Sequence, residues 1–268
     1  MFPRSLIGFA LAGLALPVSV IAQGTSVPSD TLLAGITARG KLLAAYDQAA
    51  WHGTDALLPL HLDSAAALRA GLMIAVERPE GNWTVLFGRL TPATDTFYVA
   101  YEALPTPRPD SFALRPHAPA VPLVGQERQA AAALRTALSD FGAQQRPYNG
   151  YVLPRADGAF WVYFLPAQTT TTAFPHGADI RYLMTTDGRS IIDKHPMHHA
   201  LLNLALPEKA VSGLHTVVVD DVPQDSDVFL VLARRPRRPE LIGTEHYDYE
   251  IAIDGSISWR VGERHSKR

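Results

Sequence analysis

The sequence predicts an α+β protein whose antiparallel sheets are built mainly from hairpins. Apolar residues alternate with other residues in many runs beyond position 71, which is the period of a strand with one buried face. Asp-Gly pairs separate several of these runs, and Asp-Gly favours the positive φ angles of tight hairpin turns. These pairs are Asp157-Gly158, Asp187-Gly188 and Asp254-Gly255. One amphipathic helix pattern, at about 125–141, lies between the strand-rich regions and is expected to pack on a sheet.

The composition is that of a globular chain. The 268 residues are 47% hydrophobic and 19% charged, which is enough apolar surface for a sizeable core. The formal net charge of -2 carries no electrostatic signature of nucleic-acid binding, so no nucleic-acid partner is expected. Because the chain contains no cysteine, disulfides, thiolate metal ligands and cysteine nucleophiles are excluded.

The first residues resemble a secretory signal peptide. Arg4 precedes an apolar run over 6–16, Pro17 interrupts the run, and small residues lead up to Ala22. We expect 1–22 to be removed near Ala22, which would place a bacterial protein in the periplasm or outside the cell. The alternative is an uncleaved N-terminal anchor. No later stretch reaches the length of about 18 apolar residues that a membrane span needs, so no transmembrane segment is expected after signal removal.

The part from 23 to 104 is expected to hold an N-terminal helix followed by a β-meander. Ser29 and Asp30 are good helix caps, and apolar residues at helical spacing predict a helix over 31–51. A short helix is expected over 64–70, with Gly71 just beyond it. The strands expected in this part are 72–78, 83–90 and 96–103.

A proline-rich stretch follows, at 105–122. Proline removes a backbone donor and is excluded from helix interiors and central strands, so this stretch is expected to be a linker or a long extended loop. It is the best candidate for a boundary between two subdomains, 23–104 and 123–262. The alternative is one continuous sheet with a surface loop.

The part from 123 to 262 is expected to combine the helix over 125–141 with strands, and 263–268 to form a disordered tail. The Asp-Gly pairs predict hairpins that join 151–153 to 160–165, 180–185 to 190–192, and 247–253 to 256–259. Two segments are apolar on both faces and are interpreted as buried central strands, Val217–Val219 and Val228–Ala233.

The densest group of titratable residues lies in the run 193–199. His195, His198 and His199 are candidate ligands of one divalent metal such as zinc, because imidazole is a common ligand of such ions. The residues His176, Asp179, His215 and Asp220 are possible further ligands if the fold brings them close. The run lacks the HExxH pattern of zinc peptidases. The alternative is that the chain binds no cofactor and that these histidines flank a turn at Pro196.

Two further clusters have a functional and a structural interpretation each. One face of an expected strand carries His246, Asp248 and Glu250. These residues are interpreted either as an acid/base group or as the solvated face of an edge strand. Arg234, Arg235, Arg237 and Arg238 form a basic segment. Such a segment can bind phosphate, a lipid headgroup or an acidic partner, or it can be a protective hairpin loop. The run Asp225-Ser226-Asp227 is interpreted as the cap of a turn.

The sequence leaves enzymatic activity open. It contains no GxSxG elbow, no Walker loop and no GxGxxG fingerprint. The first expectation is therefore a non-catalytic protein of the cell envelope that binds a partner or ligand. The alternative is a metal-dependent hydrolase of envelope material that uses His195, His198 and His199. A third hypothesis is association with an anionic surface through Arg234–Arg238.

Overall fold

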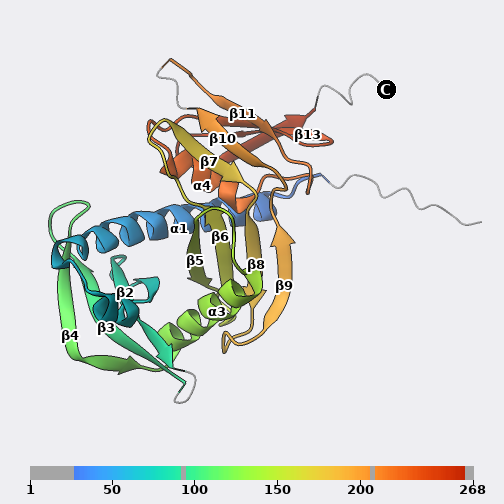
Figure 1. The fold of residues 1–268 in the computed structure, drawn as a ribbon. Helices are drawn as coiled ribbons and strands as arrows, with labels where there is room; N and C mark the ends of the chain where they lie inside the picture. The colour runs from blue at the N-terminus through green and yellow to red at the C-terminus, as the bar shows by residue number, and fades with distance from the viewer. Residues whose placement is uncertain (1–26, 92–94, 206–208, 263–268) are drawn as a thin grey trace, which may run out of the picture.

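The computed structural model describes residues 27–91, 95–205 and 209–262 (Figure 1). The expected signal peptide, 1–22, and the expected tail, 263–268, lie outside the described residues. The α+β class with an N-terminal helix and mainly antiparallel sheets is confirmed. The helices are α1 (Asp30–Asp55), the 3-10 helix η1 (Leu58–Leu60), α2 (Ser64–Arg69), α3 (Gln126–Phe141) and α4 (Asp225–Ala233).

The first sheet has the order β1-β2-β3-β4. Its strands are β1 (Leu72–Glu77), β2 (Trp83–Thr91), β3 (Thr96–Pro105) and β4 (Phe112–Leu123). The predicted meander is thus confirmed, but the interpretation of 105–122 as a linker or loop is wrong, because most of this stretch is β4. Among the described strands it pairs only with β3, so it lies at the edge of the sheet. An edge position tolerates prolines, since one side of the strand needs no ladder donors.

The second sheet has the order β5-β6-β8-β9, and α3 packs between it and the first sheet. Its strands are β5 (Tyr148–Pro154), β6 (Phe160–Pro166), β8 (Ile180–Met184) and β9 (Ile191–Pro196). The hairpins predicted at two Asp-Gly pairs are confirmed, and Gly158 and Gly188 both have positive φ angles. The helix predicted over 125–141 is confirmed, with alanines and Leu134 on its buried side.

The C-terminal region lies on the other side of α1 (Figure 1). It contains the pair β7 (Ala173–Gly177) and β10 (Leu201–Ala205) and a sheet of order β11-β12-β13-β14. The strands of this sheet are β11 (Gly213–Thr216), β12 (Glu240–Gly243), β13 (Tyr247–Ile251) and β14 (Ile257–Val261). The predicted hairpin at Asp254-Gly255 is confirmed as β13–β14.

Two predicted central strands are wrong. Val228–Ala233 belongs to α4, and Val217–Val219 lies just beyond the end of β11. Nearly all of α4 is buried, so its residues from Val228 on are apolar on every side and show no helical period. Such a run cannot be distinguished from a buried strand by its pattern alone.

Helix α1 joins the C-terminal region to the rest of the molecule. Gly40 lies at its contact with α4, where a Cβ atom would overlap the side chain of Val228. The glycine that weakens the helix pattern in the sequence is therefore needed for close helix packing. The larger buried core contains residues from both expected subdomains, among them Tyr46, Phe164 and Phe229. None of the described helices is long and apolar enough to cross a membrane.

Candidate metal centre

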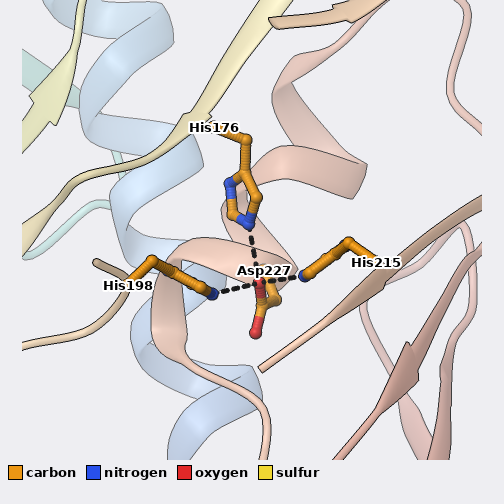
Figure 2. Close-up of side chains that lie close together, drawn as sticks. All are labelled: His176, His198, His215 and Asp227. Carbon is orange, nitrogen blue, oxygen red and sulfur yellow. Dashed lines mark hydrogen bonds and ion pairs between the residues drawn. The ribbon is translucent and has the colours of Figure 1, made fainter. Parts of the chain in front are cut away.

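Four buried side chains from separate elements converge in the C-terminal region (Figure 2). His176 comes from β7, His198 from the segment after β9, His215 from β11 and Asp227 from the first turn of α4. The Nε2 atoms of the histidines lie 2.9, 3.2 and 3.0 Å from Oδ1 of Asp227, in chain order. One potential ligand atom from each residue lies within 4.8 Å of all the others.

The backbone next to His176 requires glycine. Gly177 has a φ of 83°, and a Cβ atom there would overlap the carbonyl oxygen of Ala200 and crowd the Cβ of His198. Only glycine adopts this conformation without strain. The close approach of β7 to the segment after β9 thus brings His176 and His198 together.

The start of α4 orients Asp227. Its Oδ2 accepts a hydrogen bond of 2.6 Å from the backbone N–H of Gln224, as a carboxylate in the first turn commonly does. Its Oδ1 then faces the histidines. The carboxylate that was interpreted in the sequence as a turn cap therefore caps a helix and completes the four-residue group.

Two buried carboxylates hold the outer nitrogens of the histidines. Oδ1 of Asp179 lies 2.9 Å from Nδ1 of His198, and Oε1 of Glu240 lies 2.9 Å from Nδ1 of His215. The other oxygen of Glu240 is 2.6 Å from Nη1 of Arg234. Because a carboxylate accepts hydrogen bonds, each Nδ1 carries a proton and donates it. Nε2 of His215 likewise donates to Oδ1 of Asp227, and a metal ion that displaced the Nε2 protons would meet lone pairs that point inward, toward Asp227.

The contact between His198 and Asp227 is close without being a hydrogen bond. Nε2 of His198 is buried and has no hydrogen-bond partner in the structure, although Oδ1 of Asp227 is 3.2 Å away. In a tetrahedral site with ligand bonds of about 2.1 Å, neighbouring ligand atoms are about 3.4 Å apart. The 3.2 Å contact of His198 is near this spacing, whereas the contacts of His176 and His215 with Asp227, at 2.9 and 3.0 Å, are hydrogen bonds.

The electrostatics of the group favour cations. Burial disfavours the charged imidazole of His198, but Asp227 and Asp179 outweigh it and raise its pKa to about 10. At His215, burial again disfavours the charged imidazole, but the hydrogen bonds to Asp227 and Glu240 outweigh it and raise the pKa to about 9. At His176 burial prevails and lowers the pKa. Burial also opposes the charge of Asp227, yet the histidines hold its pKa well below the usual range. Nitrogens that bind protons so well can exchange them for a metal ion.

The group lies at the wall of a cavity of about 1030 Å³ between the β7–β10 pair and the β11–β14 sheet. His176, His198 and His215 line this cavity, whereas Asp227 is fully buried behind them. A metal ion held by the four residues would therefore lie at the part of the cavity wall that the three histidines form.

The three histidines that the sequence predicts as ligands of one metal lie in different environments in the structure. His198 belongs to the four-residue group, and His199 is exposed at the cavity wall. Nε2 of His195 lies 2.9 Å from Oδ2 of Asp220 and 3.2 Å from Oε1 of Gln224. Binding of one metal by His195, His198 and His199 together stays a prediction. Of the further ligands suggested, His176 and His215 lie in the group and Asp179 supports it from outside.

The arginines of the predicted anion site have partners within the protein. Arg234 pairs with Glu240 and, like Arg238, is buried. Arg235 and Arg237 donate to carbonyl oxygens at the end of α4, including that of Leu232. Cationic side chains at a helix C-terminus stabilise its dipole and its free carbonyls. Anion binding by this segment stays a prediction.

The second polar cluster does not form one group. Nδ1 of His246 lies 2.8 Å from Oδ2 of Asp221, whereas Asp248 and Glu250 line the cavity. The interpretation as an edge strand is wrong, because β13 lies between β12 and β14.

Sequence reasoning missed Asp227 as a member of the group. The available signal was a carboxylate in the first turn of an apolar segment, but that segment was interpreted as a strand. Comparison of the chain with protein-family models, with curated proteins and with solved structures finds no match.

Proposed function

We propose that the protein binds one divalent transition-metal ion through His176, His198, His215 and Asp227 and uses it for hydrolysis in the adjoining cavity. The observation that carries the proposal is the pairing of His198 and His215 with buried carboxylates at Nδ1, which turns both Nε2 atoms toward Asp227. A carboxylate behind Nδ1 is the usual support of a metal-bound histidine. Nitrogen and oxygen ligands of this kind suit zinc, manganese, iron, cobalt or nickel.

The cavity favours catalysis over a purely structural ion. Structural zinc sites are closed, whereas three of these four ligands line a cavity large enough for a small molecule. Zinc can expand to five ligands, and the other metals accept five or six, so a water molecule can bind on the cavity side. Metal binding lowers the pKa of that water and makes it a nucleophile near neutral pH.

The cavity wall also offers a proton acceptor. His199 is exposed there, next in sequence to His198 but outside the four-residue group. In the hydrolysis the water oxygen bonds to a carbonyl carbon, and the bond from that carbon to the leaving nitrogen or oxygen breaks. His199 is suited to take the water proton and return it to the leaving group. Water is the only co-reactant.

This proposal keeps the metal-dependent hydrolase suggested by the sequence but assigns it another set of ligands. Export to the periplasm or medium, and action on envelope material, stay predictions. A non-catalytic protein of the cell envelope that binds a partner or ligand also remains a prediction, and it differs in that it would catalyse no hydrolysis.

The test is the metal content of the full chain and of single histidine variants. After equilibration with each candidate ion and gel filtration, we expect one ion per chain by elemental analysis. His176→Ala, His198→Ala and His215→Ala should lose it, while His195→Ala and His199→Ala should keep it. Circular dichroism checks that each variant is folded. Retention of the ion by folded His198→Ala and His215→Ala would refute the ligand set.

The catalytic part is tested separately on p-nitrophenyl esters and anilides. We expect hydrolysis that a chelator abolishes and that His199→Ala reduces without loss of the ion. A fully loaded protein that cleaves none of these substrates would support the non-catalytic alternative.

A further inference from the structure

The cavity beside the four proposed ligands, hereafter the metal group, has a wall that is apolar in part. Its apolar side chains include Leu202, Leu204, Leu214, Val218, Leu241 and Trp259, from β10, β11, β12, β14 and the segment after β11. Leu214 is 71% exposed and Val218 is 78% exposed, and both line the cavity. Apolar surface gathered in a cavity is typical of ligand binding, since burying it against a ligand is favourable.

The charges in the cavity argue against an anionic ligand. Apart from the histidines, the charged residues that line it, within the part of the chain that the structure describes, are Asp248, Glu250 and Arg260. Nε of Arg260 lies 3.5 Å from Oδ2 of Asp248, so its charge is partly neutralised. Phosphate and sulfate groups are normally bound by several cationic donors, and here carboxylates outnumber guanidinium groups. The wall therefore matches an uncharged ligand.

The size of the cavity sets the scale of that ligand. A volume of about 1030 Å³ is at the upper end of the range that holds small organic molecules. The metal group occupies one part of the wall and the leucines another. A molecule that fills the site can therefore place a polar end at the ion and an apolar portion against the leucines.

We infer that the cavity binds an uncharged substrate with an apolar chain, such as a medium-chain acyl amide or ester, with its carbonyl group at the metal. The inference rests on the proposed function for the position of the carbonyl group. The apolar wall and the charge balance are independent of the metal.

Alkyl hydroxamates, which combine a neutral metal-binding head with a chain of chosen length, are suitable probes. Their binding to the metal-loaded full chain is measured by isothermal titration calorimetry. Octanohydroxamate has six more methylenes than acetohydroxamate, and each buried methylene is worth about a fourfold gain in affinity. Because burial is incomplete, we expect octanohydroxamate to bind about 50-fold more tightly.

A matched pair of variants locates the chain. Leu214→Asp places a charge in the cavity wall, and Leu68→Asp places one at a similarly exposed leucine of α2, outside the cavity. We expect Leu214→Asp to remove most of the chain-length preference while the metal content is unchanged. Leu68→Asp should behave as the wild type.

The two proposals can fail separately. A metal-loaded protein that binds both hydroxamates equally overturns the inference and leaves the proposed function in place. A protein that takes up no metal overturns the proposed function, and the same titration still reports whether the longer chain is preferred. Octyl phosphate that binds more tightly than octanohydroxamate would overturn the assignment of an uncharged substrate.

Discussion

The carboxylate of Asp179 provides a direct test of how the metal group is supported. It is 2% exposed and lies 2.9 Å from Nδ1 of His198. The imidazole ring adds about 2 Å from Nδ1 to Nε2, and a bond from Nε2 to a metal ion adds about 2 Å more. The carboxylate of Asp179 would therefore lie about 7 Å from the ion. The Coulomb energy with a doubly charged ion at that distance is about 5 kcal/mol at an effective dielectric constant of about 20.

The measured effect of removing Asp179 is expected to be smaller than this energy. The same carboxylate also stabilises the proton on His198 that the ion must displace, so the two effects partly cancel. Loss of such a supporting carboxylate usually weakens metal binding about 10- to 100-fold, or about 1.4–2.8 kcal/mol. Asp179→Asn keeps an acceptor oxygen and should weaken metal binding about tenfold, whereas Asp179→Ala should weaken it about 100-fold.

The assay is competition for zinc against a chromophoric chelator at a fixed pH. Asp193→Asn is the control, because Asp193 is an exposed carboxylate on β9. It should bind zinc as tightly as the wild type. Wild-type affinity in folded Asp179→Ala would refute the assignment of this carboxylate as a support of the metal group. An equal loss in Asp193→Asn would show that the effect is not specific.

Three further predictions concern the scaffold. Gly177→Ala should lower the unfolding free energy by about 2 kcal/mol and should also lower the metal content, because the new methyl group overlaps the carbonyl oxygen of Ala200. Urea denaturation and elemental analysis measure the two effects, and unchanged values in both would contradict this prediction. Asp225→Asn should lower the unfolding free energy by about 3 kcal/mol, since the fully buried carboxylate accepts hydrogen bonds from two arginines and a tyrosine. A decrease below about 1 kcal/mol in urea denaturation would argue against this role. Burial raises the pKa of the Asp47 carboxyl in the folded protein, despite the hydrogen bond that this carboxyl accepts from Tyr151. The contribution of Asp47 to the unfolding free energy is therefore fully present below the unfolded pKa of about 3.9 and is lost as the pH rises through the higher folded pKa. Asp47→Asn should therefore gain stability relative to the wild type between about pH 3 and pH 7, and a constant difference between the two denaturation curves would count against this reasoning.

Local patterns predicted most of the fold. The Asp-Gly pairs at 157, 187 and 254 mark hairpins that the structure confirms, because tight turns depend on only a few residues. Helices with one polar face, such as α3, carry their period in the sequence. Helix α4 carries none, since it is buried on all sides, and β4 is concealed by prolines that only an edge position permits.

The metal group was harder to predict because its members are distant in sequence. Neighbouring histidines at 195, 198 and 199 suggested a site by proximity along the chain. In the structure His198 instead meets His176 and His215 through the pairing of β7 with β10 and the position of β11. The arginines at 234 and 235 illustrate the same difficulty, because their charge suggested exposure although they bind backbone carbonyls and a buried glutamate.

The four proposed ligands are carried by two strands, one connecting segment and one helix. An ion bound by all of them would act as a removable cross-link, joining β7 to β11 and both to α4. Stripping the ion would then release both walls of the cavity at once, so metal supply would set the rigidity of the binding site as well as its reactivity.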